Sequence, residues 1–148
     1  MEMFDIKEEN TVEALRECFS LCEKHFYEVG GSNQFDPDWA TLESMLSMGM
    51  LSVVVARIGN TPVGYYMSMV SRDLLSPEVV GRELAIYVDK QYRGGRLFFK
   101  LMGVVQQVLL GRGVRKQYTT FIAGHNDKLP LRLGFSPVEI TYSKLIGG

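Results

Sequence analysis

Two adjacent stretches of the chain carry the clearest alternation of hydrophobic and polar positions. In residues 83–89, every second side chain is a large apolar one, and this period of two predicts a strand. After a polar loop, a stretch opening at Gly94-Gly95 is apolar apart from a narrow polar stripe that includes Lys100 and Gln107. This period near 3.6 predicts a helix, which Gly111 closes.

The same patterns predict ten elements along the whole chain. Their order is β-α-α-β-β-β-α-β-α-β, with no repeat and no linker. Strands are expected at residues 3–7, 51–58, 62–70, 83–89, 116–123 and 138–145, and helices at 10–29, 36–49, 94–111 and 128–133. Residues 71–81 are expected to form a polar connection.

Capping residues predict where the first two helices begin. Asn10 is the expected N-cap of the first helix, with Glu13 as its capping-box partner. Asp36 is the expected N-cap of the second helix, since Pro37 suits the first turn.

Length and composition place the chain among ordinary globular proteins. Its 148 residues predict one domain, residues 1–148, and 46% of them are hydrophobic and 22% charged. A net charge of −1 predicts no nucleic-acid partner and no attraction to an anionic membrane. Without a membrane-length apolar run or a signal-peptide pattern, the protein is expected in the cytoplasm.

One helical face carries Cys18, Cys22 and His25, which together could hold a metal ion. Three ligands from one helix with no obvious fourth make a poor zinc site, and buried cysteine packs as a small hydrophobe. We therefore expect these side chains to be core or boundary residues, and we expect no metal. Two cysteines also form no disulfide framework.

The loop between strand and helix suits a phosphate group. Its sequence, Gln-Tyr-Arg-Gly-Gly-Arg over residues 91–96, brings two glycines and two arginines to a helix N-terminus. Unpaired N–H groups and the helix dipole attract anions there, and glycines let the backbone come close. A plain strand-to-helix turn is the alternative. A P-loop or a dinucleotide-binding fold does not fit, because no Gly-Lys-Ser/Thr, third glycine or suitably spaced acid follows.

This loop resembles the acyl-CoA-binding motif Q/R-x-x-G-x-G/A of the GNAT superfamily of N-acetyltransferases. Arg96 departs from the motif, since it stands where the last small residue is usual. Leu133-Gly134-Phe135 is similar to the segment that closes the last helix of these proteins, and the order of elements matches over essentially the whole chain. The "RGG" form of the loop resembles that of short members encoded by bacteriophages.

The resemblance implies an α/β (α+β) fold with a mixed, mostly antiparallel sheet of about six strands flanked by helices. It further implies that acetyl-CoA binds between the strands at residues 83–89 and 116–123. An N–H near Tyr87 or Val88 would then polarise the thioester carbonyl. The cofactor-binding residues implied are Tyr87, Val88, Arg93, Gly94, Gly95, Arg96, Leu97 and Asn126.

Acetyl transfer to an amine needs a base and is helped by an acid. Glu83 is the favoured base, acting either directly or through a water molecule, with Asp89 as the second choice. The alternative for Glu83 is an ordinary solvent-facing residue paired with Arg82 or another base. Both interpretations stay open.

The general acid is harder to find. Many family members carry a tyrosine four residues before the glycine of Leu-Gly-Phe, and Pro130 stands there in this chain. None of Tyr118, Tyr142 and His125 occupies the matching position, and Tyr142 is taken as the candidate acid. Otherwise the proton comes from water, or the protein transfers acyl groups poorly.

Two functions follow from the resemblance. The first is an acetyl-CoA-dependent N-acetyltransferase acting on a primary amine of a small molecule, a peptide N-terminus or a lysine. The second is a weakly active or inactive phage accessory or virion protein that binds a partner, located in the host cytoplasm. A cleft blocked by Tyr87 or Phe121 would favour the second. The final strand is a candidate edge for a homodimer.

Overall fold

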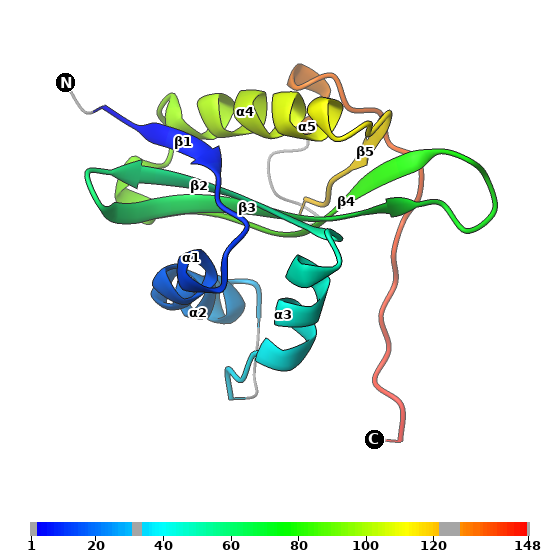
Figure 1. The fold of residues 1–148 in the computed structure, drawn as a ribbon, viewed down its shortest axis with the longest axis horizontal. Helices are drawn as coiled ribbons and strands as arrows, with labels where there is room; N and C mark the ends of the chain where they lie inside the picture. Colours follow the sequence, from blue (N-terminus) through cyan, green and yellow to red (C-terminus); the bar gives the residue numbers. More distant parts are fainter. Residues whose placement is uncertain (1–2, 31–33, 122–127, 148) are drawn as a thin grey trace.

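Five strands and five α-helices make up the part of the chain that the computed structural model describes, which is residues 3–30, 34–121 and 128–147 (Figure 1). The strands are β1 (Asp5–Glu8), β2 (Leu51–Ile58), β3 (Thr61–Arg72), β4 (Val79–Val88) and β5 (Lys116–Tyr118). The α-helices are α1 (Val12–Glu17), α2 (Phe19–Glu28), α3 (Trp39–Ser47), α4 (Leu97–Gly111) and α5 (Leu129–Arg132), with a 3₁₀ turn η1 (Lys90–Tyr92) after β4.

The strands form one sheet in the order β1-β2-β3-β4-β5. Neighbours are antiparallel except for β4 and β5, which run parallel. Helices α4 and α5 lie on one face of the sheet and α1, α2 and α3 on the other (Figure 1). The predicted α/β class with a mixed, mostly antiparallel sheet is confirmed.

Both faces of the sheet are buried, because helices cover each of them. Neighbouring residues of β3 point to opposite faces: Tyr66 packs with Leu101 and Met102 of α4, and Tyr65 packs with Leu15 of α1. The central strands therefore read as almost continuous hydrophobic runs.

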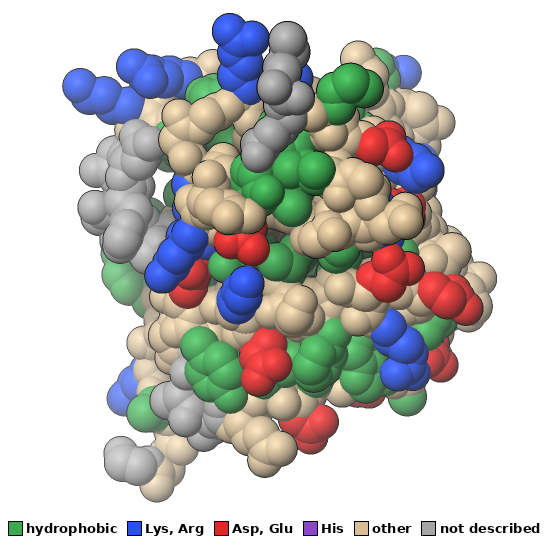
Figure 2. All heavy atoms as spheres, turned by 90° about the vertical axis from the view of Figure 1, so that its left-hand side faces the viewer, with side chains coloured by type: hydrophobic (Ala, Val, Ile, Leu, Met, Phe, Trp, Pro, Cys, Tyr) green, Lys and Arg blue, Asp and Glu red, His purple; other side chains and the backbone are tan. Residues whose placement is uncertain are grey.

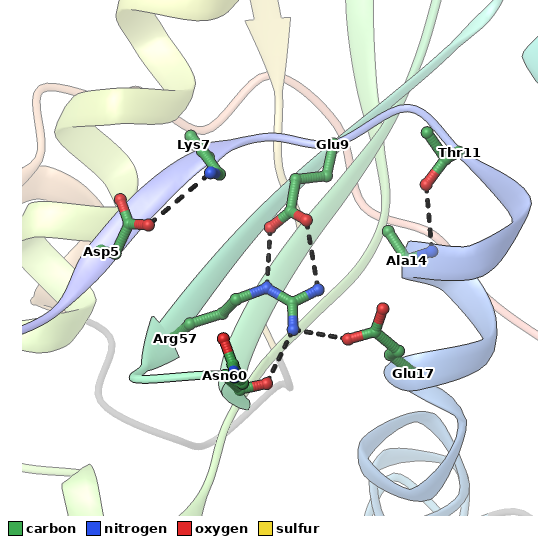
Figure 3. A network of polar contacts seen from close by, with 8 residues as sticks. All are labelled: Asp5, Lys7, Glu9, Thr11, Ala14, Glu17, Arg57 and Asn60. Carbon is green, nitrogen blue, oxygen red and sulfur yellow. Dashed lines mark hydrogen bonds and ion pairs between the residues drawn. The ribbon is translucent and has the colours of Figure 1, made fainter.

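An arginine inside the sheet anchors the N-terminal segment (Figure 3). The Arg57 guanidinium of β2 donates to both carboxylate oxygens of Glu9 at 2.9 and 3.1 Å, and to Glu17 at 2.6 Å. It also donates to the Asn60 carbonyl at 2.9 Å. Its hydrogen bonds to Glu9, and then to Glu17, raise the pKa of Arg57. This network fixes where α1 leaves the sheet.

An irregularity in β4 separates it from β5. Ala85 lies opposite Met67 and Glu83 opposite Ser68, so Leu84 has no partner on β3 and forms a β-bulge. A bulge bends its strand and increases the local twist. Pairing between β4 and β5 covers three residues and stops at Arg82, directly before this bulge.

The helix starts differ from the predicted ones. Thr11 caps α1, since its hydroxyl accepts from the Ala14 N–H at 3.1 Å, while the Asn10 side chain accepts from the Val53 N–H of β2 at 2.8 Å. Asn10 is thus used to fix the chain to the sheet. Asp38 caps α3 by accepting from the Thr41 N–H at 3.1 Å, so the prediction of Asp36 is also wrong.

The single first helix and the sixth strand are corrected as well. The helix is divided at Cys18 into α1 and α2. Residues 138–145 pair with no strand among the described residues and run away from the body of the protein (Figure 1), leaving Tyr142 85% exposed. The reason is that β5 pairs over only three residues and presents no long edge to a further strand.

The strands β3 and β4 extend further than predicted, and only residues 73–78 remain as the connection between them.

Within the described residues, no helix has the length and apolar character that a membrane crossing requires. Basic and acidic side chains both occur, with hydrophobic ones between them, on the face drawn in Figure 2.

Candidate active site

A cavity of about 780 Å³ opens where β4 and β5 separate. Its floor is the second half of β4, including the bulge, and its other walls come from α2, the glycine loop, the start of α4, the segment after β5 and α5. Its lining includes His25, Glu28, Val29, Glu83, Leu84, Ile86, Tyr87, Val88, Arg93, Gly94, Gly95, Thr119, Thr120 and Phe121. Tyr87 and Phe121 border the cavity without closing it.

Main-chain groups of β4 face this cavity. The Asp89 N–H donates to the Val63 carbonyl at 2.9 Å, and Val88 lies opposite Gly64. Because hydrogen-bonded and non-hydrogen-bonded pairs alternate in an antiparallel ladder, the N–H groups of Ile86 and Val88 point away from β3. They point to the side where β5 has parted from β4. Ile86 was not among the predicted site residues, because its orientation follows from the β3–β4 register.

The Glu83 carboxylate is held from the segment after β5. The Thr119 hydroxyl donates to one oxygen at 2.6 Å, and the Thr120 hydroxyl donates to the other at 2.8 Å. The Thr120 N–H adds a third contact at 3.3 Å. The Arg82 guanidinium instead lies over the Tyr118 ring, 4.1 Å from its centre. Glu83 is therefore an oriented, half-buried carboxylate at the cavity, and Arg82 does not pair with it.

His25 enters the cavity wall from α2. Its Nδ1 lies 2.9 Å from the Tyr65 hydroxyl, and its ring stacks on Tyr87 with centres 5.8 Å apart. Burial lowers the pKa of His25 below its ordinary value, with opposing effects from Glu83 and Glu28, so the imidazole is neutral near pH 7. A neutral imidazole can accept a proton.

The helical spacing correctly placed Cys18, Cys22 and His25 on an inward face, but it gave no sign that a cavity lies at the His25 end. Burial, followed by the nearby Cys22, raises the pKa of Cys18 to about 12, so this thiol is inert at neutral pH. Among the described residues, no group of three or more His, Cys, Asp or Glu side chains is arranged to hold a metal ion.

The glycine loop turns sharply into α4. Gly94 has a φ of +80°, in the left-handed region that favours glycine. Within the described part of the chain, the N–H groups of Gly94, Gly95 and Arg96 have no hydrogen-bond acceptor. The first turn of a helix adds further unpaired N–H groups, beginning with that of Leu97.

Arg93 contacts protein groups on several sides of the loop. Its Nε donates to the Val88 carbonyl at 2.6 Å, its Nη2 donates to Glu28 at 2.7 Å, and its guanidinium lies 4.9 Å from the Tyr87 ring centre. The Arg93 N–H also donates to the Lys90 carbonyl, at 3.2 Å. This arginine ties the end of β4 to α2.

The remaining predicted residues lie in different places. The Leu97 side chain is buried in the core, so only its backbone is near the loop. Asp89 is paired with Lys24 at 3.4 Å. Tyr142 lies in the exposed C-terminal segment and does not line the cavity, and Asn126 and His125 fall outside the described residues.

Comparison with known proteins agrees with this architecture. The model of the acetyltransferase (GNAT) family matches residues 10–135. The chain therefore belongs to the GNAT family of acetyltransferases. A comparison with curated protein sequences finds no significant match.

Solved structures share the fold at low sequence identity. An aminoglycoside acetyltransferase from an uncultured soil metagenomic sample, solved with sisomicin, has a TM-score of 0.76 and 19% identity over 96% of each chain. The aminoglycoside acetyltransferase AAC(6')-Iy, solved with a CoA-linked bisubstrate analogue, has a TM-score of 0.75 and 20% identity over 97% of this chain and 99% of its own. Glucosamine-6-phosphate N-acetyltransferase from Arabidopsis thaliana has a TM-score of 0.74 and 18% identity, covering 98% and 99%. None of these bears on the resemblance to phage-encoded proteins.

Proposed function

We propose that the protein is an acetyl-CoA-dependent N-acetyltransferase that transfers the acetyl group directly to a primary amine while both substrates are bound. The observation that supports this most is that the Ile86 and Val88 N–H groups, the Glu83 carboxylate and the glycine loop all border one cavity. Its lining leaves the cleft open, which argues against the alternative of an inactive binding module.

The cavity suits the two ends of acetyl-CoA. The pantetheine arm would lie along the separated edge of β4, where an N–H of Ile86 or Val88 can donate to the thioester carbonyl oxygen as negative charge develops on it. The pyrophosphate would lie at the loop, where the N–H groups of Gly94, Gly95, Arg96 and Leu97 and the dipole of α4 favour an anion. Arg93 would hold the loop in shape.

The protons can be followed through the transfer. The ammonium group loses a proton to become the free amine, and its nitrogen then bonds to the carbonyl carbon. The carbon–sulfur bond breaks to release CoA as a thiolate, and the nitrogen gives up its second proton as the amide forms. Glu83 is the base, and it acts through water, since Ile86 lies three positions along β4, roughly 10 Å at about 3.3 Å per residue. Because Pro130 occupies the family tyrosine position, the thiolate takes its proton from water.

The direct test is CoA release from acetyl-CoA in the presence and absence of primary amines. We expect amine-dependent release that saturates in both substrates, with the N-acetylated amine detected by mass spectrometry. Intersecting initial-rate patterns would indicate a ternary complex. Saturable acetyl-CoA binding without any acetylated product from a broad amine panel would contradict the proposal.

A further inference from the structure

A second cavity, of about 270 Å³, lies on the face of the sheet covered by α1, α2 and α3. Three residues, His25, Val29 and Leu84, line both this cavity and the larger one. Leu84 is the unpaired residue of the β4 bulge, so the bulge forms part of the wall between the two spaces. The second cavity therefore meets the larger one beside Glu83, the residue directly before Leu84 in β4.

The lining of the second cavity is aromatic and aliphatic. It includes Phe26, Phe35, Trp39, Leu42, Tyr65 and Met67, and no described lining residue is an Asp, Glu, Lys or Arg. The rings pack on one another: Phe26 and Phe35 have centres 5.6 Å apart. The Tyr65 hydroxyl is already bonded to His25.

This lining disfavours highly polar amines and favours amines that carry an apolar ring. A polyhydroxylated or polycationic group placed here would lose its water without gaining hydrogen-bond partners, which is costly. An apolar ring would instead bury its surface and stack on neighbouring rings. With a volume of about 270 Å³, the cavity has room for one aromatic ring on a short chain.

We propose that the acceptor is a small primary amine carrying an aromatic ring on a short aliphatic chain, with the ring in the second cavity. This inference rests on the proposed function. The amino group then lies at the junction of the cavities, next to Leu84 and within water-mediated reach of Glu83. His25, whose ring is also at the junction, contacts the short chain.

The first experiment compares kcat/KM for 2-phenylethylamine, ethylamine, the aminoglycoside sisomicin and a peptide with an N-terminal phenylalanine. We expect 2-phenylethylamine to exceed ethylamine by about 100-fold and to exceed the other two as well, because hydrophobic pockets discriminate by roughly tenfold or more per missing apolar group. A higher value for ethylamine or sisomicin would overturn the inference while leaving the acetyltransferase in place. A higher value for the peptide would overturn the small-molecule assignment.

The second experiment fills the cavity. Ala85 of β4 lines it, and Ala85→Leu adds three carbon atoms to the space, whereas the exposed Ala40 of α3 provides the matched control Ala40→Leu. We expect Ala85→Leu to reduce the preference for 2-phenylethylamine over ethylamine about tenfold or more and Ala40→Leu to retain it. Acetyl-CoA titration of each variant establishes that it is folded. An unchanged preference in folded Ala85→Leu would overturn the inference, and failure of every amine with every variant would contradict the proposed function itself.

Discussion

The two cavities meet at Leu84, yet they are built from different parts of the protein. The larger one presents main-chain N–H groups of β4 and the glycine loop together with one oriented carboxylate. The smaller one presents side chains of the helices α1, α2 and α3 and of the strands β3 and β4. Main-chain recognition depends on a bulge, a turn and a helix start, and many sequences can form these. Side-chain recognition depends on the identity of each residue in the wall.

We expect this difference to divide the work of the site: the larger cavity carries out the transfer, and the smaller cavity determines which amine is preferred. Changes in the larger cavity should affect every amine alike, because every amine needs the thioester and the base. Changes in the smaller cavity should alter the order in which amines are preferred.

The largest effect is expected for Glu83→Gln. Glutamine keeps the shape, and its amide oxygen can still accept from the Thr119 hydroxyl while its amide nitrogen donates to the Thr120 hydroxyl, but it cannot take a proton. We expect kcat to fall about 10²–10⁴-fold with every amine, in line with the loss of a general base. The control is Glu78→Gln, an exposed residue between β3 and β4. An activity of Glu83→Gln equal to that of this control would show that Glu83 is not the base.

A smaller effect is expected for Arg93, where two substitutions are compared. Arg93 binds the Val88 carbonyl and Glu28 through different nitrogens, and a lysine cannot reproduce this fork. We expect Arg93→Ala and Arg93→Lys both to weaken acetyl-CoA binding about tenfold, which is about 1.4 kcal/mol. Isothermal titration calorimetry measures this. Full affinity in Arg93→Lys would mean that the positive charge contacts the phosphates directly.

The smallest effect is a pH dependence of stability from His25, at the junction of the cavities. Burial lowers its pKa in the folded state below the value of 6.5 that applies when it is exposed, so the unfolded chain binds the proton more readily. The free energy of unfolding should therefore fall as the pH drops below 6.5, until the folded pKa is passed. His25→Gln removes this contribution. Urea unfolding of both proteins between about pH 5 and 8 should show the advantage of the wild type shrinking on acidification. A difference that stays constant or grows would contradict the assignment.

The sequence was informative where the signal is local. The strand, glycine loop and α4 were predicted because their periodicities and Gly94-Gly95 act within a few residues of one another. The Glu83 position followed from the resemblance, but its hydrogen bonds to Thr119 and Thr120 bring together β4 and the segment after β5, which are more than thirty residues apart.

What the sequence could not predict depends on distant partners. Asn10 and Thr11 can both cap a helix. Thr11 is the cap because the Asn10 side chain accepts a hydrogen bond from the Val53 N–H of β2. Residues 138–145 have a strand-like pattern, but a strand forms only where a neighbouring edge exists. His25 lies at the junction of the two cavities, and that junction depends on the β4 bulge. No pattern in the sequence predicts this bulge.

The central claim is that acetyl-CoA binds at the loop between β4 and α4. The most direct measurement is calorimetric titration of acetyl-CoA into the wild type, Gly95→Glu and Gly103→Glu. Gly95 is at the expected pyrophosphate position, and Gly103 is an exposed glycine of α4. A side chain added at Gly103 would meet no atom within 4 Å. One added at Gly95 would meet only the Tyr92 carbonyl oxygen, at 4.0 Å. We predict saturable binding by the wild type and Gly103→Glu and a loss of more than about tenfold in Gly95→Glu, because a carboxylate there repels the phosphates. Equal affinities in all three proteins, or no binding by the folded wild type, would contradict the account.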